Sequence, residues 1–167
     1  MKLKSRKLPA FTLIELLIVI AIVGIMAAAV ILAINPAKRS GQARDAIRKN
    51  DIVVLADAFQ AYYVTHEGLY PPPIVFSCSP SVFDVLVTSG ELKVAPKDPQ
   101  EPNRRYCVRI KSNSPPGTGR TEAAIFTGPG LEQPTNPALP IYCWNSITNT
   151  AFETDYDTCF MGINWGI

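Results

Sequence analysis

The chain has 167 residues, enough for one domain with an extension and too few for a multidomain enzyme. Apolar residues make up 47% of it and charged residues 18%, with the apolar residues concentrated in the first 34 positions. Without the four leading cations (Lys2, Lys4, Arg6 and Lys7) the net charge of +2 becomes −2, so most of the molecule lacks the positive balance that drives nucleic-acid binding. DNA is therefore a disfavoured partner.

A basic stretch at residues 1–10 precedes a long apolar run. Nineteen residues, 16–34, pass without a charge. An α-helix of about 20 residues spans the hydrocarbon of a bilayer. We therefore predict a leader at residues 1–10 and a membrane-spanning helical segment at residues 11–34.

Two other interpretations of the apolar run stay open. Ala27 and Ala29 form a small-x-small site, so the run could be a secretory signal cut after Ala29, which would release a secreted binding module. An uncleaved signal anchor would instead hold a monomeric binding module at the membrane. Glu15 argues against both, because a charge in a membrane helix costs several kcal/mol on insertion scales and usually has a partner or a role.

Glu15 follows Phe11 by four residues, the spacing at which two side chains share a helix face. A cut between Ala10 and Phe11 would place a new ammonium one helical turn before the carboxylate. A helix N-terminus also favours a nearby anion. The carboxylate could therefore stay within its own chain or contact the ammonium of a neighbour, in which case Glu15 would serve assembly.

The segment "FTLIELLIVIAIVGIMAAAVILAI", behind a short basic leader, resembles the N-terminal signature of type IV pilins and type II secretion pseudopilins. The matching positions are Phe11, Thr12, Leu13 and Glu15, with the apolar tract after them. The resemblance implies that a prepilin peptidase cleaves between Ala10 and Phe11 and methylates the new amine of Phe11. It also implies that Glu15 pairs with a neighbouring subunit's N-terminus. The family commonly has Gly before the cut; Ala10 is small enough that we expect cleavage.

The same resemblance implies a cellular setting and a set of partners. The precursor would be a single-pass inner-membrane protein with its C-terminal domain outside the cytoplasm, and it would assemble into a periplasmic or extracellular filament. Its partners would be other copies of itself, the prepilin peptidase, an assembly platform with its ATPase, and membrane lipid. No cofactor is expected. The choice between a pilus and a secretion pseudopilus stays open.

Residues 35–68 are predicted to continue the helix as an amphipathic half. Asn35-Pro36 should bend or loosen it, because Pro lacks an N–H and disfavours the α region for the residue before it. Gly68 and the prolines at 71–73 should end it. An apolar stripe should pack on a sheet. The predicted stripe is Ile47, Val54, Leu55, Ala58, Phe59 and Tyr62.

The charged face of this helix is expected to be solvated. For Arg44 and Arg48, one turn apart, the alternative is a contact with phosphate from lipid headgroups or DNA. His66, the sole histidine, is expected on the surface near the helix end. The sequence contains no Walker loop and no GxSxG motif, so we expect no catalytic residues and no enzyme.

Residues 69–167 are expected to form a β-rich head with disulfides. An even number of cysteines after an export-like segment suggests two disulfides in an oxidising compartment. Cys78, Cys107, Cys143 and Cys159 allow three pairings, and the shortest loops favour Cys78 with Cys107 and Cys143 with Cys159. No CxxC pair occurs, which argues against tetrahedral zinc.

Local patterns place the elements of this head. "SVFDVLVTS" predicts a short helix, and "RYCVRIK" alternates as a half-buried strand does. "TEAAIFT" is predicted to pair with it as a hairpin across "SNSPPGTGR", and "IYCW" is a further strand. The expected fold class is α+β and pilin-like, a long N-terminal α-helix whose first half is transmembrane and whose second half packs against a small antiparallel β-sheet.

A second resemblance concerns the head. After "EGLYPP", seven residues follow the order Leu…Gly-x-Leu…Pro-x-Asp-Pro…Tyr of secretion pseudopilins: Leu86, Gly90, Leu92, Pro96, Asp98, Pro99 and Tyr106. Major members of that group bind calcium in a C-terminal loop. The segment "FETDYD" offers hard oxygen ligands in Glu153, Asp155 and Asp157, without the spacing of an EF-hand, and we take these three as calcium candidates.

Overall fold

The computed structural model describes residues 11–71, 76–111 and 122–160. The chain divides into two compact units, Met1–Arg39 and Ser40–Ile167. Each unit is considered by itself. The leader predicted at residues 1–10 lies outside the described residues.

The first unit contains helix α1, Leu13–Ile34. It begins two residues later than predicted, because Thr12 adopts an extended conformation and caps it. Residues Leu13–Ile31 have a mean hydropathy of 2.9, and by length and composition this stretch can cross a membrane. None of it is buried within the protein. Its apolar surface therefore requires a partner outside the chain, whether lipid or protein.

The predicted break at Asn35-Pro36 is confirmed. Helix α1 ends at Ile34, Asn35 takes a left-handed conformation with φ of 47°, and helix α2 spans Pro36–Thr65. Asn tolerates this conformation better than most residues, and Pro fits the first position of a helix. From Ser40 onward α2 belongs to the second unit.

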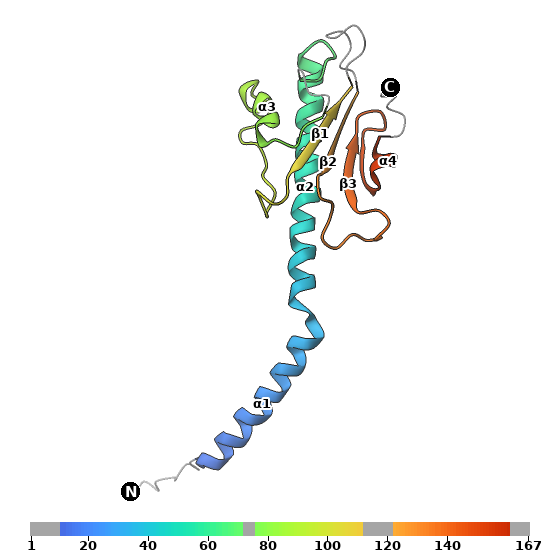
Figure 1. Cartoon of the computed structure of the whole chain (residues 1–167). Coiled ribbons are helices and arrows are strands. Elements are labelled where there is room, and N and C mark those ends of the chain that lie inside the picture. The colour runs from blue at the N-terminus through green and yellow to red at the C-terminus, as the bar shows by residue number, and fades with distance from the viewer. Residues whose placement is uncertain (1–10, 72–75, 112–121, 161–167) are drawn as a thin grey trace, which may run out of the picture. The chain divides into compact units, whose positions relative to one another are not determined.

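The second unit is built on a four-stranded antiparallel sheet in the order β1-β2-β3-β4, with α2 along one face and helix α4, Tyr156–Cys159, on the other (Figure 1). The strands are β1 Tyr106–Ile110, β2 Ala123–Thr127, β3 Ile141–Asn145 and β4 Thr150–Thr154. The first three were predicted. Strand β4 was missed, because its sequence TAFET has little apolar alternation and only its last residue is buried.

Along the chain, two short helices follow α2 and precede β1. They are η1, Pro80–Phe83, and α3, Asp84–Thr88. They confirm the short helix predicted from "SVFDVLVTS". Phe83 and Leu86 are buried in the main core, and the Phe83 ring meets Phe59 of α2 edge-on at 6.3 Å between centroids. The α+β architecture predicted from the sequence is therefore confirmed.

The apolar stripe of α2 is rotated from its predicted position. Leu55, Ala58, Phe59 and Tyr62 are buried as predicted, but Ile47 is 49% and Val54 37% exposed. Ile52 and Ala56 take part in the core in their place. Toward the helix N-terminus the buried face continues with polar residues (Arg48, Asp45) and with Gly41. The apolar pattern of the sequence does not indicate this part of the buried face, because its residues are not apolar side chains.

Each face of the sheet has its own core. Tyr106, Val108 and Ile110 of β1 point to the α2 side, and Cys107 points to the opposite side. The smaller core on that opposite side contains Cys107, Ala124, Phe126, Ile141, Cys143 and Cys159. Both disulfides therefore stabilise the face of the sheet that α2 does not cover.

Candidate processing and assembly site

The carboxylate of Glu15 is engaged by the residue that caps α1. Its Oε2 atom accepts hydrogen bonds from the backbone N–H and the hydroxyl of Thr12, both at 2.9 Å. The Glu15 N–H in turn donates to Thr12 Oγ1 at 3.3 Å. This reciprocal arrangement is a capping box, which satisfies two donors that a helix start would otherwise leave open.

A cap of this kind stabilises a helix more in lipid than in water. Lipid offers no hydrogen-bond partner, and each unsatisfied backbone group there costs several kcal/mol. The Thr12–Glu15 contact therefore gives the carboxylate a partner within its own chain. The cap uses only residues three apart, so it can form as soon as the first turn of α1 forms.

Phe11 does not share a helix face with Glu15, as the four-residue spacing suggested. Phe11 precedes the N-cap and is 86% exposed, while α1 starts at Leu13. This arrangement belongs to the uncleaved chain, and the one-turn spacing expected after a cut between Ala10 and Phe11 stays a prediction. Ala10, on the other side of the predicted cut, lies outside the described residues.

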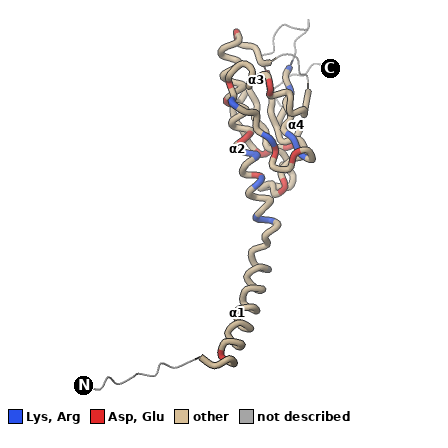
Figure 2. The backbone as a smooth tube through the Cα atoms, turned by 90° about the vertical axis from the view of Figure 1, so that its left-hand side faces the viewer, with Lys and Arg blue, Asp and Glu red and all other residues tan. Residues whose placement is uncertain are grey.

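Figure 2 shows how unevenly charge is distributed along the described chain. Helix α1 contains one charged residue, Glu15, near its start, whereas Lys, Arg, Asp and Glu recur along α2 and the sheet unit. The large apolar side chains of α1 whose exposure is described are all exposed, with Ile22 the least exposed of them at 52%. A single acid at the end of an otherwise uncharged exposed helix is the principal feature of the first unit.

Charge is compensated very differently at the start of the sheet unit. Arg48, expected to be solvated, has 0% exposure. Its Nε and Nη2 atoms donate to the two carboxylate oxygens of Asp98 at 2.7 and 3.0 Å. Its Nη1 atom donates to Asp45 at 2.8 Å and to Glu132 at 2.7 Å, and Gln100 accepts a further bond from Nη2 at 3.0 Å. Arg48 therefore has no donor left for phosphate, and that alternative was wrong for it.

The residues around Arg48 fasten two loops to α2. The Asp45 carboxylate accepts the backbone N–H groups of Glu132 and Gln133 at 2.9 and 2.6 Å. Arg44 donates through Nε to Glu132 at 2.7 Å. Hydrogen bonds from Arg44, together with those from Arg48, outweigh burial and lower the pKa of Glu132 to about 2. We call Arg44, Asp45, Arg48, Asp98 and Glu132 the ion cluster.

The motif residues Asp98 and Tyr106 acquire structural roles in this arrangement. Asp98 is the bidentate partner of Arg48, and Tyr106 donates its hydroxyl to Asp51 of α2 at 2.6 Å. Burial and this hydrogen bond raise the pKa of Tyr106. Sequence reasoning placed both in a motif without finding their partners, because Asp98 lies 50 residues from Arg48. The i, i+3 pair Asp45–Arg48 was the only local signal.

The structure does not bring the three calcium candidates together as ligands. Glu153 forms an ion pair with Lys49 and accepts hydrogen bonds from the N–H and hydroxyl of Thr135. Asp155 caps α4 by accepting the Thr158 N–H at 2.7 Å, and Asp157 is exposed. Among the described residues, no group of three or more His, Cys, Asp or Glu side chains could hold a metal ion. Two of the three carboxylates have protein partners, and calcium binding stays a prediction.

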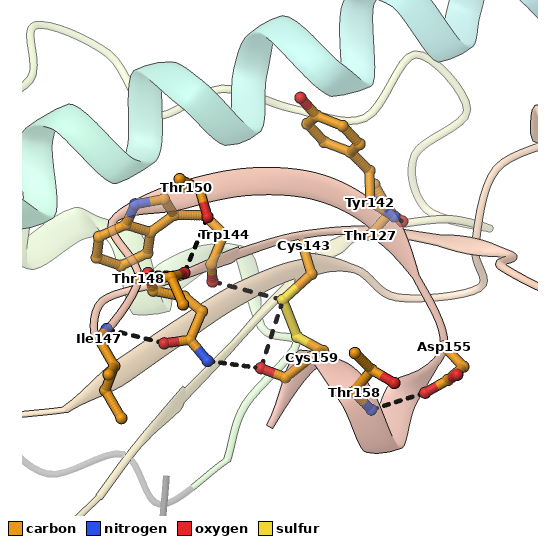
Figure 3. The surroundings of a disulfide bond; sticks show 11 residues. Thr127, Tyr142, Cys143, Trp144, Ile147, Thr148, Thr150, Asp155, Thr158 and Cys159 are labelled. Atoms are coloured by element: carbon orange, nitrogen blue, oxygen red, sulfur yellow. Dashed lines mark hydrogen bonds between the residues drawn. A yellow bond between two sulfur atoms is a disulfide. The ribbon is translucent and has the colours of Figure 1, made fainter. Parts of the chain in front are cut away.

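Two disulfides are formed, Cys78–Cys107 and Cys143–Cys159, the pairs with the shortest loops. Figure 3 shows the second bridge joining β3 to α4, where Cys159 also accepts a hydrogen bond through its carbonyl from the Asn145 amide at 3.0 Å. His66, expected on the surface, is exposed and stacks on Tyr62 with 3.7 Å between ring centroids.

Comparison with known proteins identifies the N-terminal segment. A family model described as the prokaryotic N-terminal methylation motif matches residues 9–31. This motif is the signature of type IV pilins and pseudopilins, and it contains Ala10, Phe11 and Glu15. No curated protein and no solved structure matches the chain. The match confirms the resemblance seen in the N-terminal sequence and leaves the residues after 31 without a described relative.

Proposed function

We propose that the protein is the precursor of a structural filament subunit, of the type IV pilus or type II secretion pseudopilus class. The methylation motif at residues 9–31 is the observation that carries the proposal. Proteins with this motif are structural rather than catalytic, so no cofactor is required. In the proposed sequence of events, α1 inserts in the membrane, a prepilin peptidase cuts between Ala10 and Phe11 and methylates Phe11, and the subunits polymerise.

The surface of α1 supports a role in polymerisation. Its apolar side chains are exposed all round the helix and can be covered by lipid before assembly and by other copies of α1 afterwards. Contacts between identical subunits that do not close into a ring generate helical fibres. The extraction from lipid would be driven by an assembly platform and its ATPase.

Glu15 supports the same proposal because, in the described chain, its carboxylate has hydrogen-bond partners but no cation beside it. Thr12 supplies neutral donors, whereas the amine of a processed neighbour is a cation and would add the attraction of opposite charges to its hydrogen bond with the carboxylate. The amine of a processed neighbour would therefore displace Thr12 from the carboxylate. In this proposal Glu15 changes partner, from its own cap in the membrane to another subunit in the filament.

The two disulfides support a topology with the sheet unit outside the cytoplasm. Structural disulfides persist in oxidising compartments and are rare where thiols are kept reduced. The proposed organisation is a leader at 1–10, a membrane and filament-core helix at 11–34, an amphipathic helix at 35–68 and a β-rich head at 69–167. The filament would be periplasmic or extracellular.

The Glu15→Gln variant tests the proposal sharply. Gln serves at the third helical position of a capping box as Glu does, so the variant keeps the cap and removes the charge. We expect normal membrane insertion and cleavage but no filaments, assayed in the producing cells by shearing and electron microscopy. Normal filaments from Glu15→Gln would overturn the assembly role.

Thr12→Val is the matched control. It removes both Thr12 side-chain bonds of the cap and retains the carboxylate. We expect Thr12→Val subunits to assemble. Loss of assembly in Thr12→Val together with normal filaments from Glu15→Gln would indicate that the cap, and not the charge, is what the filament needs.

Mass spectrometry of the mature N-terminus separates the proposal from its rivals. We expect a chain that begins at N-methylated Phe11. A chain beginning at Val30 would identify a signal peptide cut after Ala29, and an intact N-terminus would identify an uncleaved anchor.

A further inference from the structure

A cavity of about 610 Å³ opens on the face of the sheet that α2 does not cover. Its floor is Phe126 of β2 with the Cys78–Cys107 disulfide, and Cys107 is the direct cross-strand partner of Phe126. Ligand pockets usually measure about 300–1,000 Å³. The size of the cavity is therefore that of a site for a small molecule.

Three aromatic side chains surround the floor ring. Phe76 lies nearly parallel to Phe126, at 25° and 6.2 Å between centroids. Tyr156 and Phe160 stand edge-on to it, at 5.8 and 5.4 Å. Parallel and edge-on contacts are the two arrangements that aromatic pairs prefer. A flat aromatic guest would therefore find both kinds of contact within the cavity.

Two features hold the cavity in shape without a guest. The Tyr156 hydroxyl donates a hydrogen bond to the carbonyl of Gly128, which fixes one wall against the floor. A Cβ atom at Gly128 would lie 2.8 Å from the Arg105 carbonyl oxygen and 2.9 Å from Cys107 Sγ. Glycine thus permits the close approach of β2 to the disulfide beneath the cavity. Binding to a preformed site of this kind loses little free energy to ordering.

The charge of the lining has one sign. Among the residues that the structure describes, Arg105 and Arg109 line the cavity, and no Asp or Glu does. The Arg109 guanidinium lies over the Phe160 ring, 5.0 Å from its centroid. Arg105 is exposed, and within the part of the chain that the structure describes no carboxylate forms an ion pair with it. An arginine at the edge of an apolar cavity favours a planar anion that can accept two parallel hydrogen bonds.

We propose that this cavity binds a small aromatic carboxylic acid, with the ring of the ligand against Phe126 and Phe76 and its carboxylate at Arg105. The carboxylate of the ligand matches the guanidinium of the exposed Arg105, and the rings match the aromatic body of the ligand. Phe76 is 59% and Tyr156 42% exposed, so the ligand would cover apolar surface that is now in water. The proposal is independent of cleavage and of filament assembly.

The test uses the full chain in detergent micelles with its seven phenylalanines replaced by 4-fluorophenylalanine. The probe is 2-naphthylacetate, followed by 19F NMR. We expect saturable shifts of the Phe76 and Phe160 signals, with Phe59 of the main core unchanged. Phe11, in the anchor, reports any probe that merely enters the micelle.

Charge is tested with a matched pair of variants. Arg105→Gln should raise the Kd for 2-naphthylacetate at least threefold. Lys93→Gln removes an equal charge from an exposed position away from the cavity and should change the Kd less than twofold. Phe76→Ala should weaken the probe further and, at an exposed position, should leave folding intact.

Three results would overturn the proposal. The first is the absence of a saturable shift at Phe76 and Phe160 up to millimolar probe. The second is an equal loss of affinity in Arg105→Gln and Lys93→Gln, which would indicate attraction by net charge alone. The third is equal binding of the neutral analogue 2-naphthylethanol at the same two signals, which would leave the carboxylate without a role.

Discussion

Helices α1 and α2 are separated by the single residue Asn35, yet their surfaces find partners in opposite ways. The apolar side chains of α1 are exposed, and among the described residues its charged residue, Glu15, has as its partner Thr12, three residues earlier. In α2 even a buried arginine has every donor engaged by residues of the same chain. The difference indicates that the sheet unit is complete within one chain and that α1 requires other molecules.

Glu15 and Arg48 illustrate this difference at the level of single charges. The partners of Glu15 lie three residues away, so they are available as soon as the helix forms. The partners of Arg48 lie between 3 and 84 residues away, so they come together only in the folded head. A locally held charge can change partner at little cost, whereas a buried charge with distant partners cannot.

The largest effect on the head should come from Arg48→Ala. The variant leaves Asp45 and Asp98 buried without a cation and leaves Glu132 with Arg44 alone. Breaking a buried ion pair on one side costs about 3–5 kcal/mol. Denaturation of the full chain in micelles, followed by tryptophan fluorescence, measures the free energy of unfolding. Arg39→Ala, at an exposed arginine of the same helix, is the control. If Arg48→Ala lowered the free energy of unfolding by less than about 1 kcal/mol, the ion pairs of Arg48 would be no stronger than exposed ones, contrary to this prediction.

Removal of the bridge between β3 and α4 should have the next largest effect. The cysteines are 16 residues apart, and closing a loop of that length stabilises the fold by about 3 kcal/mol in the chain-entropy model. The double variant Cys143→Ala, Cys159→Ala should unfold at correspondingly lower denaturant and should not respond to reductant at this site. Unchanged stability would mean that the hydrogen bond from Asn145 to Cys159 suffices to hold the segment.

Acid should weaken the ion cluster through Glu132. Its pKa is lowered from 4.5 to about 2 in the folded protein, so its contribution is fully present above pH 4.5 and is lost as the pH falls toward 2. Glu132→Gln should cost about 1.5–3 kcal/mol at pH 6, the usual value for hydrogen bonds to charged groups. The difference from the wild type should shrink by pH 2.5.

Denaturation midpoints measured between pH 6 and pH 2.5 test this dependence. Glu67→Gln, at an exposed position after α2, should keep the wild-type profile. A Glu132→Gln profile parallel to that of the wild type would show that the acid loss arises at other groups.

The smallest effect should follow from Val54→Ala, which sharpens the boundary between the buried and exposed faces of α2. Val54 is 37% exposed and Leu55, its neighbour in the chain, is fully buried. We expect Val54→Ala to change the stability by about 0.5 kcal/mol or less and Leu55→Ala by about 2–5 kcal/mol. Equal losses of stability at the two positions would indicate that Val54 is part of the buried face, as the apolar pattern predicted.

Several features followed from local sequence patterns. The apolar run predicted α1, and Asn35-Pro36 predicted its end, because a helix of this composition needs no distant partner and Pro acts on its immediate neighbours. Strand β1 was recognised by alternation, β2 by the turn-rich segment before it, and β3 as a further strand, whereas β4 was not recognised. Strand β4 forms through its antiparallel pairing with β3, and its own side-chain pattern does not indicate a strand.

The candidate site divides in the same way. The motif residues around Phe11 and Glu15 are contiguous and could be found by reading the chain, although the start of α1 at Leu13 changed their expected geometry. The burial of Arg48 could not be found from neighbouring residues, because nothing in the local sequence distinguishes a buried arginine from a solvated one. The pairing of Lys49 with Glu153 joins residues 104 apart and likewise could not be found from the local sequence.

By itself, the sequence determined the anchor helix, its break, the processing motif and the general α+β class. These depend on interactions between neighbours or with solvent, which a short window of residues contains. Only the tertiary structure decided how α2 is rotated on the sheet, which charges are buried, and where aromatic rings and Arg105 surround a cavity. Those outcomes depend on which distant groups supply partners, since a buried charge is stable only where opposite charges and hydrogen bonds converge on it.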